Sequence, residues 1–205
     1  MKNFFITLEG CEGVGKSTAM SFIEKYLTEK KVNFVMTREP GGTPIGEAIR
    51  EILLNTQKEV VLSKTELLLM FAAREQHIEH VIKPALNAGK TVVSDRFTDA
   101  SFAYQGGGRK IAMDRIQLLA NWIQGDLEPD LTLLLDAPVL IGLNRINLRG
   151  DKDRIEQENN DFFKRVREVY LERAKQFPKR FVIINADASL EDVQGQIVAA
   201  LGKRV

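Results

Sequence analysis

One short segment constrains this chain more than any other part of its sequence. Residues 10–17 read Gly-Cys-Glu-Gly-Val-Gly-Lys-Ser and match the phosphate-binding pattern G-x-x-x-x-G-K-[ST] at every fixed position. The glycines allow successive backbone N–H groups to point at a triphosphate, while Lys16 can reach the outer phosphates and the Ser17 hydroxyl can ligate Mg²⁺. An apolar run at residues 4–8 precedes this phosphate loop, and a helical pattern of apolar residues follows it. We therefore predict a strand, the loop and a helix in that order.

Short β-branched and aliphatic runs alternate with longer segments of helical period along the rest of the chain. This alternation predicts an α/β fold with a five-stranded parallel sheet flanked by helices on both faces. The expected strands are residues 4–8, 32–37, 91–94, 131–135 and 181–184. Besides the helix after the loop, helices are expected over about 44–54, 65–81 and 111–124, and after Pro138, Asn160 and Ser189.

Length and composition favour one compact domain over residues 1–205. The chain has 205 residues, of which 44% are hydrophobic, enough for one substantial core. The 29 basic residues nearly balance the 28 acidic ones. The overall charge therefore gives no reason to expect nucleic acid or an anionic membrane as a partner. Cys11 is the only cysteine, which excludes an internal disulfide and suits a reducing compartment. No long apolar segment is present, so we expect no signal peptide or membrane span and a cytoplasmic location.

The phosphate loop alone is compatible with several classes of nucleotide-binding protein. A GTPase needs a D-x-x-G segment after a strand and an N-K-x-D segment that reads the base, and the sequence offers only Asp136-Ala137-Pro138 and no N-K-x-D. A motor ATPase usually carries an acidic pair after an apolar strand, but the run 131–135 ends in Asp136 alone. Both classes are disfavoured.

Asp95 and Arg96 follow the predicted strand at 91–94, at the edge where open α/β sheets bind ligands. Asp95 can hold Mg²⁺ or its waters, and Arg96 can bridge donor and acceptor phosphates whose charges otherwise repel each other. An adjacent acid and base often form an ordinary surface ion pair. The position beside a phosphate loop favours the functional interpretation.

A glycine-containing charged run, Arg149 to Arg154, lies between two amphipathic segments. This composition suits a mobile lid near residues 147–158, whose closure can bring Arg149 or Arg154 onto a transferring phosphoryl group. A mixed charge run is also typical of a solvated loop. The lid interpretation therefore depends on the rest of the site.

Four segments together resemble the thymidylate kinase family. They are R-E-P-G-G-T-P-I-G at 38–46, D-R-F at 95–97, S-F-A-Y-Q-G-G-G-R at 101–109 and D-R-I-E at 153–156. The resemblance implies a phosphate-loop kinase fold, a homodimer, and phosphoryl transfer from MgATP to dTMP that gives ADP and dTDP for dTTP synthesis. Val14 stands where one subtype of the family carries an arginine, so the sequence resembles the bacterial type, whose catalytic arginine lies in the lid.

The resemblance also implies roles for individual residues. Arg38 would clamp the 5′-phosphate of dTMP, Glu12 would accept a hydrogen bond from the 3′-hydroxyl, and Tyr104 would exclude a 2′-hydroxyl. Phe71 would stack on thymine while Arg74, on the same helix face, donates to a base carbonyl. The implied dTMP-binding residues are Glu12, Arg38, Phe71, Arg74, Arg96, Ser101, Tyr104 and Gln105. The implied ATP-binding residues are Gly10, Cys11, Glu12, Gly13, Val14, Gly15, Lys16, Ser17 and Thr18. The catalytic candidates are Lys16, Arg96, Arg149 and Arg154, and the Mg²⁺ ligands are Ser17 and Asp95.

Several further interpretations belong to the sequence alone. The chain could be a kinase for another nucleoside or monophosphate, or a nucleotide-binding module without catalysis. His77 and His80 are expected on a polar helix face and not as metal ligands, because no other His or Cys accompanies them. The very apolar run 67–73 indicates either a subunit contact or buried core. The resemblance further implies a cis Glu39–Pro40 bond.

Overall fold

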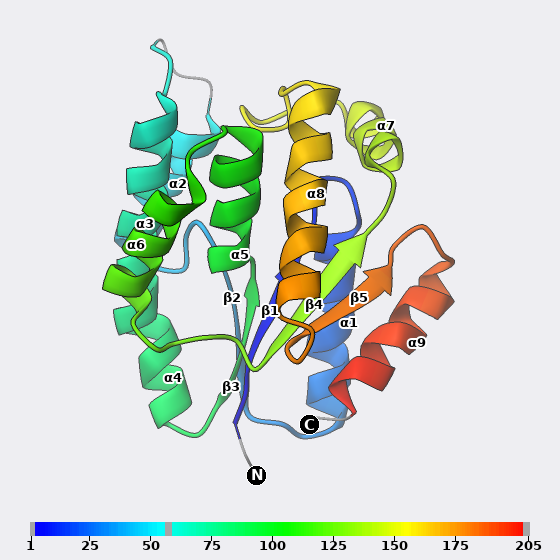
Figure 1. Cartoon of the computed structure of the whole chain (residues 1–205). Coiled ribbons are helices and arrows are strands. Elements are labelled where there is room, and N and C mark those ends of the chain that lie inside the picture. The colour runs from blue at the N-terminus through cyan, green and yellow to red at the C-terminus, as the bar shows by residue number, and fades with distance from the viewer. Residues whose placement is uncertain (1–2, 56–58, 203–205) are drawn as a thin grey trace.

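A parallel five-stranded sheet forms the centre of the molecule (Figure 1). The computed structural model describes residues 3–55 and 59–202. The strands are β1 (Phe5–Glu9), β2 (Phe34–Arg38), β3 (Thr91–Asp95), β4 (Leu131–Asp136) and β5 (Phe181–Asn185), in the order β2-β3-β1-β4-β5. Each neighbouring pair is parallel. The predicted fold class is therefore confirmed, with small shifts at the strand ends.

The register of the sheet brings the sequence motifs to one edge. Arg38 pairs with Asp95 across β2 and β3, and Asp95 pairs with Leu8 across β3 and β1. The phosphate loop begins directly after β1. Because parallel strands end at the same edge, Arg38, Asp95 and the loop meet where this kind of sheet binds ligands.

Helices cover both faces of this sheet. In Figure 1, α8 (Asn160–Gln176) crosses in front of the strands, and α1 (Lys16–Glu29) lies behind them. The other helical segments are α2 (Pro44–Leu54), α3 (Ser63–His77), η1 (Ile78–Ile82), α4 (Lys83–Asn87), α5 (Thr98–Ser101), η2 (Phe102–Gly108), α6 (Met113–Gln124), α7 (Val139–Arg149) and α9 (Leu190–Leu201). Among the described residues, no helix is both long and apolar enough to span a membrane.

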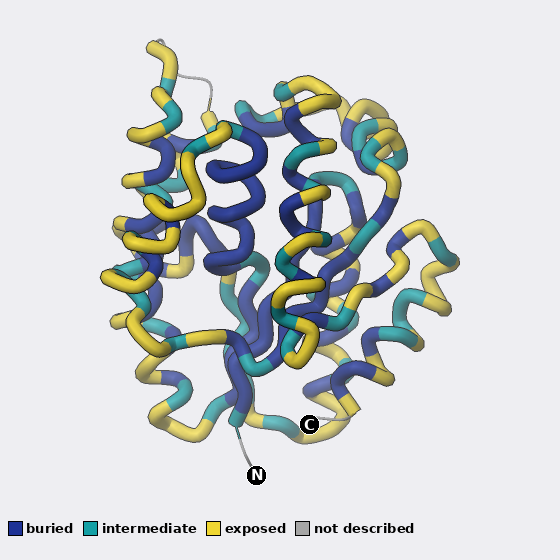
Figure 2. The backbone as a smooth tube through the Cα atoms, in the orientation of Figure 1, coloured by how far each residue is buried: buried dark blue, intermediate teal, exposed yellow. Residues whose placement is uncertain are grey.

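The main core lies between the sheet and the helices that cover it. Ile6 of β1, Ile23 of α1, Leu133 of β4 and Val166 of α8 are completely buried, and β1, β3 and β4 lie in the dark centre of Figure 2. Burying one such side chain contributes about 1.5–3 kcal/mol relative to leaving it exposed. The core therefore holds the ligand-binding edge of the sheet in a fixed geometry.

Local signals set the start of α2 as predicted. The Thr43 hydroxyl accepts a hydrogen bond from the N–H of Gly46 at 3.0 Å, and Pro44 occupies the first turn. Such a cap satisfies a backbone donor that the helix itself leaves without an acceptor. The Glu39–Pro40 bond just before it is cis, as the resemblance implied.

Two helical segments differ from the prediction. The helix expected over 65–81 is α3, which continues through the π-helical turn η1 into α4. No helix was expected over α5 and η2, because the glycines at 106–108 disfavour helix in isolation. These glycines allow η2 to approach α8 closely: a Cβ added to Gly107 would lie 2.7 Å from the carbonyl oxygen of Arg165. Tertiary packing therefore overrides the local preference.

Candidate active site

The phosphate loop has the strained, glycine-dependent backbone that its pattern predicts. Gly10, Gly13 and Gly15 all have positive φ, of 141°, 71° and 94°. Lys16 is buried within the loop, where its Nζ donates to the carbonyl oxygens of Gly10 at 3.2 Å and Cys11 at 2.8 Å. The loop thus holds a cation at its centre, next to the N-terminus of α1, which favours negative charge.

A cavity of about 420 Å³ opens in front of this loop; we call it the phosphate cavity. It is lined by Glu12, Gly13, Gly15, Lys16, Ser17, Thr18, Arg38, Glu39, Pro40, Arg50, Leu54, Asp95, Arg96, Arg145, Ile146, Arg149, Asp153 and Glu156. These residues come from the loop and the start of α1, the ends of β2 and β3, the helices α2 and α7, and the segment that follows α7. Six of them carry a cationic side chain, which is the arrangement expected for a site that binds several phosphate groups.

Arg96 and Glu12 form the electrostatic centre of the site. Arg96 Nη2 donates to Glu12 Oε1 at 2.5 Å, and Arg96 Nη1 donates to the hydroxyl of Tyr170 at 3.2 Å. Tyr104 also donates to Glu12 Oε1, at 3.1 Å. Burial raises the pKa of Glu12, but Arg96 and Lys16 outweigh it and bring the pKa down to about 2. Glu12 is therefore an ionised acceptor throughout the physiological range.

Ser17 and Asp95 line the same cavity, as the sequence predicted for a Mg²⁺ site. Asp95 Oδ1 is buried and has no hydrogen-bond partner among the described residues. An acceptor left in this state fits a metal ion or its waters. The described residues contain no group of three or more His, Cys, Asp and Glu that could hold a metal. Mg²⁺ at a nucleotide is typically held by one or two protein ligands together with phosphates and waters.

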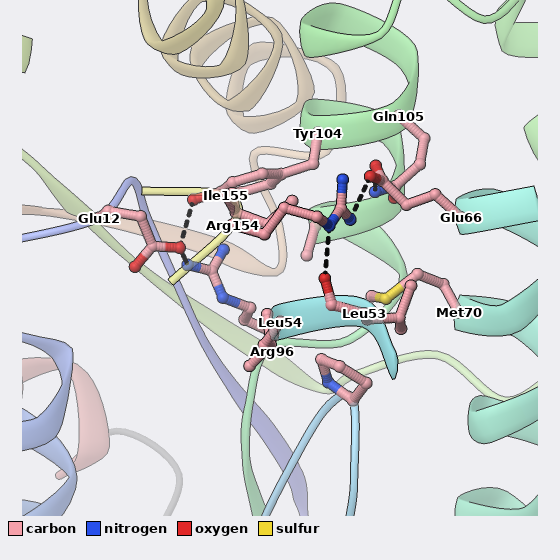
Figure 3. Close-up of a pocket in the computed structure, with 12 residues that line it drawn as sticks. Glu12, Leu53, Leu54, Glu66, Met70, Arg96, Tyr104, Gln105, Arg154 and Ile155 are labelled. Carbon is pink, nitrogen blue, oxygen red and sulfur yellow. Dashed lines mark hydrogen bonds and ion pairs between the residues drawn. The ribbon is translucent and has the colours of Figure 1, made fainter. Parts of the chain in front are cut away.

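A second, smaller cavity of about 60 Å³ adjoins the first (Figure 3); we call it the inner cavity. Its lining is Glu12, Pro40, Leu53, Leu54, Glu66, Met70, Arg96, Ala100, Tyr104, Gln105, Arg154 and Ile155. Glu12 and Arg96 line both cavities. The inner cavity is smaller than the roughly 300–1,000 Å³ of typical ligand pockets, and Arg154 and Ile155 from the predicted lid form part of its lining.

Of the residues expected at the base, Gln105 lines the inner cavity, whereas Phe71, Arg74 and Ser101 are buried and are not part of its lining. Arg74 is fully buried, with its Nε 2.8 Å from Glu39 and its Nη2 3.0 Å from the Ser101 hydroxyl. The Arg74 guanidinium lies 4.6 Å from the ring centroid of Phe71, which is itself buried in the core. Met70, and not Phe71, lines the cavity. Phe71 therefore does not line the inner cavity in this structure, and its implied stacking on thymine stays a prediction.

Two buried polar atoms in this region lack a hydrogen-bond partner among the described residues. They are Arg74 Nη1 and Gln105 Oε1. Only four side-chain atoms of this kind occur in those residues, and a third is Asp95 Oδ1. Buried polar atoms normally find partners, so their concentration at the predicted ligand positions indicates that a ligand completes them.

The two lid arginines lie in different cavities. Arg149 lines the phosphate cavity, where both of its short contacts, at 2.5 and 2.6 Å, go to the carboxylate of Glu156. Arg154 lies in the inner cavity, donating to Glu66 Oε2 at 2.6 Å and to the carbonyl oxygen of Leu53 at 2.7 Å. From the sequence, both arginines were equal candidates for contacting the transferring phosphoryl group. The structure brings only Arg149 to the phosphate cavity.

For three residues that the sequence singled out, the structure shows surroundings that the sequence did not predict. Arg38 lines the phosphate cavity but is half exposed, and it is paired with Glu47 at 2.8 Å. The Cys11 side chain is buried away from the cavity, and burial raises the pKa of its thiol to about 12. His77 is buried rather than on a polar face, and its ring contacts the side chains of Thr37 and Glu39.

Two cationic residues of the site were missed from the sequence. Arg145 lies four residues before Arg149 on α7 and donates to the carbonyl oxygen of Gly13 at 3.4 Å. Arg50 lines the phosphate cavity and donates to the carbonyl oxygen of Pro40 at 2.9 Å. The four-residue spacing that places Arg145 and Arg149 on one helix face was available in the sequence. No spacing or motif in the sequence pointed to Arg50.

A third cavity, of about 360 Å³, lies on the other side of the phosphate loop. Its lining is largely apolar: Val14, Gly15, Thr18, Ala19, Phe22, Leu135, Arg145, Ala186, Ala188, Leu190, Val193, Gln194 and Ile197. We call it the outer cavity. A hollow with apolar walls and few polar groups, continuous with a phosphate loop, suits the base of a nucleotide.

Comparison with known proteins agrees with this geometry. Residues 8–197 match the family model described as thymidylate kinase. The chain is 55% identical to the thymidylate kinase of Vesicomyosocius okutanii, over 96% of each chain. It is 53% identical to the thymidylate kinase of Neisseria gonorrhoeae, over 98% of this chain and 97% of the other. The crystal structure of thymidylate kinase from Ehrlichia chaffeensis superposes with a TM-score of 0.80 at 32% identity, covering 98% of this chain and 99% of that one. The chain belongs to the thymidylate kinase family.

Proposed function

We propose that this protein transfers the γ-phosphoryl group of ATP, bound with Mg²⁺, to the 5′-phosphate of dTMP, yielding ADP and dTDP for dTTP synthesis. One observation supports this most directly: a cationic phosphate cavity and an inner cavity with base-reading groups share Glu12 and Arg96 as a common wall. A reaction between two nucleotides needs two adjoining sites that meet at their phosphates.

The donor nucleotide binds across the phosphate loop. Its base occupies the outer cavity between α1 and α9, and its phosphates follow the loop N–H groups toward Lys16. Mg²⁺ bound to the phosphates is held by the Ser17 hydroxyl and by Asp95, directly or through water. When bound, the ion neutralises charge on the phosphate oxygens. The orphaned Asp95 Oδ1 supports this assignment.

The acceptor base binds in the inner cavity, with its imide edge toward α3 and η2. Arg74 Nη1 is a buried donor and Gln105 Oε1 a buried acceptor, and neither has a partner among the described residues. Thymine presents a carbonyl oxygen and the N3–H side by side, which match this pair. Tyr104 lies beside Glu12, where its ring leaves little space for a 2′-hydroxyl and favours deoxyribose.

Transfer depends on alignment and on positive charge. The acceptor is already an anionic phosphate oxygen, so no general base is required. Arg96 bridges the donor and acceptor phosphates, Arg38 binds the 5′-phosphate, and Arg149 closes from the lid onto the transferring group. Arg154 acts on the acceptor side, because it lies among the inner-cavity residues. Charge of this kind stabilises a transition state whose negative charge spreads over phosphoryl oxygens.

The protein acts as a single domain with a lid near 147–158, as a homodimer, in the cytoplasm. Support for the dimer comes from α3 and α6, which pack together and carry an exposed apolar surface made of Leu68, Leu118 and Trp122. Trp122 is 77% exposed, and extensive exposed apolar surface is typical of protein–protein interfaces. The free, buried Cys11 is compatible with a reducing compartment.

An assay of ADP production with a panel of nucleoside monophosphates tests the proposed reaction. We expect dTMP to give the highest kcat/KM, and thin-layer separation with γ-labelled ATP to show the label in dTDP. A kinase for another acceptor would turn over a different monophosphate faster. A non-catalytic module would bind MgATP tightly without any turnover that depends on an acceptor.

A further inference from the structure

We propose that Glu66 sets the base specificity of the acceptor site by fixing the orientation of the Gln105 side-chain amide. The inference rests on the proposed function, since it assigns a positioning role at the same inner cavity. Glu66 belongs to α3 and Gln105 to η2, and both line that cavity (Figure 3). Neither the family motifs nor the charge pattern of the sequence pointed to Glu66.

Glu66 is a buried carboxylate surrounded by donors. It is 1% exposed and accepts hydrogen bonds from Gln105 Nε2 at 3.0 Å, Arg109 Nη2 at 3.0 Å and Arg154 Nη2 at 2.6 Å. Burial raises its pKa, but the hydrogen bonds from Arg109 and Gln105 outweigh burial and lower the pKa below its usual value. An ionised carboxylate has no proton to donate and can only accept.

This one-sided chemistry determines which end of the Gln105 amide faces Glu66. The NH₂ group must point toward the carboxylate, because the reverse orientation would set two acceptors against each other and lose a buried hydrogen bond. Such a loss changes an equilibrium by about tenfold to a hundredfold. Gln105 is itself 3% exposed, and its Oε1 has no partner among the described residues. The amide oxygen is therefore the group that Gln105 offers to a base.

An acceptor at this position distinguishes one class of base from another. Thymine and uracil present N3–H, which donates to an amide oxygen, whereas cytosine presents an N3 lone pair, which does not. Arg74 Nη1, a buried donor that also has no partner among the described residues, would discriminate in the same direction on contact with the base, because it fits a carbonyl and not the amine of cytosine. Glu66 thus acts through Gln105 against dCMP, while dUMP, which shares the imide edge of dTMP, serves as an internal control.

The test compares the Glu66→Gln variant with wild type on three acceptors. A glutamine at position 66 can donate as well as accept, so the Gln105 amide is no longer held in one orientation. We expect the ratio of kcat/KM for dTMP to that for dCMP to fall by about tenfold or more, with the dTMP to dUMP ratio unchanged. An unchanged dTMP to dCMP ratio, or an equal loss on all three acceptors, would overturn the inference.

Two further variants separate positioning from general damage. In Gln105→Met the amide is absent, so adding Glu66→Gln to it should cause no further loss of the dTMP to dCMP ratio; additive losses would contradict a role through Gln105. Glu66→Asp keeps an acceptor-only carboxylate and should retain the preference for dTMP over dCMP even where its KM rises. Loss of that preference in a folded Glu66→Asp protein counts against the inference.

The wild-type protein provides a test if Glu66→Gln does not fold. In ¹⁵N NMR spectra without nucleotide, the NH₂ pair of Gln105, identified by its loss in Gln105→Met, should show NOEs to the Cγ protons of Glu66. Absence of these NOEs, with the NH₂ signals of Gln105 observed and assigned, would show that the amide is not held in this orientation and would overturn the inference. Failure of the proposed function is a separate result, because it would appear as wild-type protein that transfers no phosphoryl group to dTMP.

Discussion

Arg96 donates to Glu12 across 2.5 Å and thereby connects the turn after β3 with the phosphate loop after β1. The contact holds both residues at the common wall of the phosphate and inner cavities. Arg96 also has a positive φ of 70°, an unusual conformation for a side chain of this size that costs roughly 1–3 kcal/mol. The surrounding structure therefore holds this guanidinium in place at a cost in stability, as is typical of functional residues.

Removing either central cation should abolish most of the activity without unfolding the protein. We expect Lys16→Ala and Arg96→Ala each to lower kcat by about 10²–10³-fold or more, because each removes a positioned charge that stabilises the transferring phosphoryl group. Steady-state assays with MgATP and dTMP measure the effect, and thermal unfolding checks the fold. The control is Lys25→Ala on α1, whose exposed ion pair with Glu29 should be dispensable. Near wild-type turnover in either variant would refute the role of that cation.

Replacing Arg149 and replacing Arg154 should change different kinetic constants, because the two side chains line different cavities. Arg149 lines the phosphate cavity, so we expect Arg149→Ala to lower kcat by about tenfold to a thousandfold with little change in the KM for dTMP. Arg154 contacts Glu66 and Leu53 in the inner cavity, so Arg154→Ala should change mainly the KM for dTMP. The opposite distribution of effects, with Arg154→Ala acting on kcat alone, would show that the lid rearranges between this structure and the reacting complex.

Much of the fold and part of the site could be predicted from the sequence. Both ends of each expected strand lie within two residues of the ends of the observed strand. The strands could be located because alternating short apolar runs and helical periods are local signals. Six of the loop residues, Glu12, Gly13, Gly15, Lys16, Ser17 and Thr18, line one cavity together with Asp95 and Arg96, since parallel strands deliver their ends to the same edge. Whether each has its predicted role stays a prediction.

What could not be predicted depends on contacts between distant segments. The helical segment at 98–108 packs against α8 through Gly107 and Gly108, a tertiary contact that no local pattern reveals. Phe71 and Met70 are adjacent in sequence, and only the rotation of α3 decides which of them reaches the inner cavity. Arg149 and Arg154 have the same side chain but lie in different cavities. Arg149 pairs with Glu156 and Arg154 with Glu66, and the positions of these two carboxylates depend on the fold.

The proposed dimer can be tested on α6 without touching the active site. Trp122 and Leu118 are exposed apolar residues one helical turn apart, and in a dimer a buried charge in their place would have no compensating partner. We expect Trp122→Asp to shift the mass measured by light scattering from about twice that of the 23.1 kDa chain to that of one chain. Asp114→Ala, an exposed change on the same helix, should leave the mass unchanged. A wild-type protein with the mass of a single chain would exclude the dimer.

The stability of the protein should depend on pH through Glu9, the last residue of β1. Its carboxylate is fully buried and accepts hydrogen bonds from the Tyr170 hydroxyl and the Phe97 N–H, each at 2.8 Å. Burial, and then the negative charge of Asp99, raise its pKa to about 8, although Arg96 acts in the opposite direction. The folded protein therefore holds a proton on Glu9 that the unfolded chain releases above its ordinary pKa.

The sign of the effect follows from this difference in bound protons. Between the unfolded pKa, about 4.3, and the folded value of about 8, the folded state binds more protons, so the contribution of Glu9 to the free energy of unfolding falls as pH rises. Glu9→Gln keeps the shape but does not titrate. Urea unfolding from pH 5 to pH 9 should show wild type losing stability relative to Glu9→Gln as pH increases, and parallel profiles for the two proteins would show that Glu9 is ionised in the folded state.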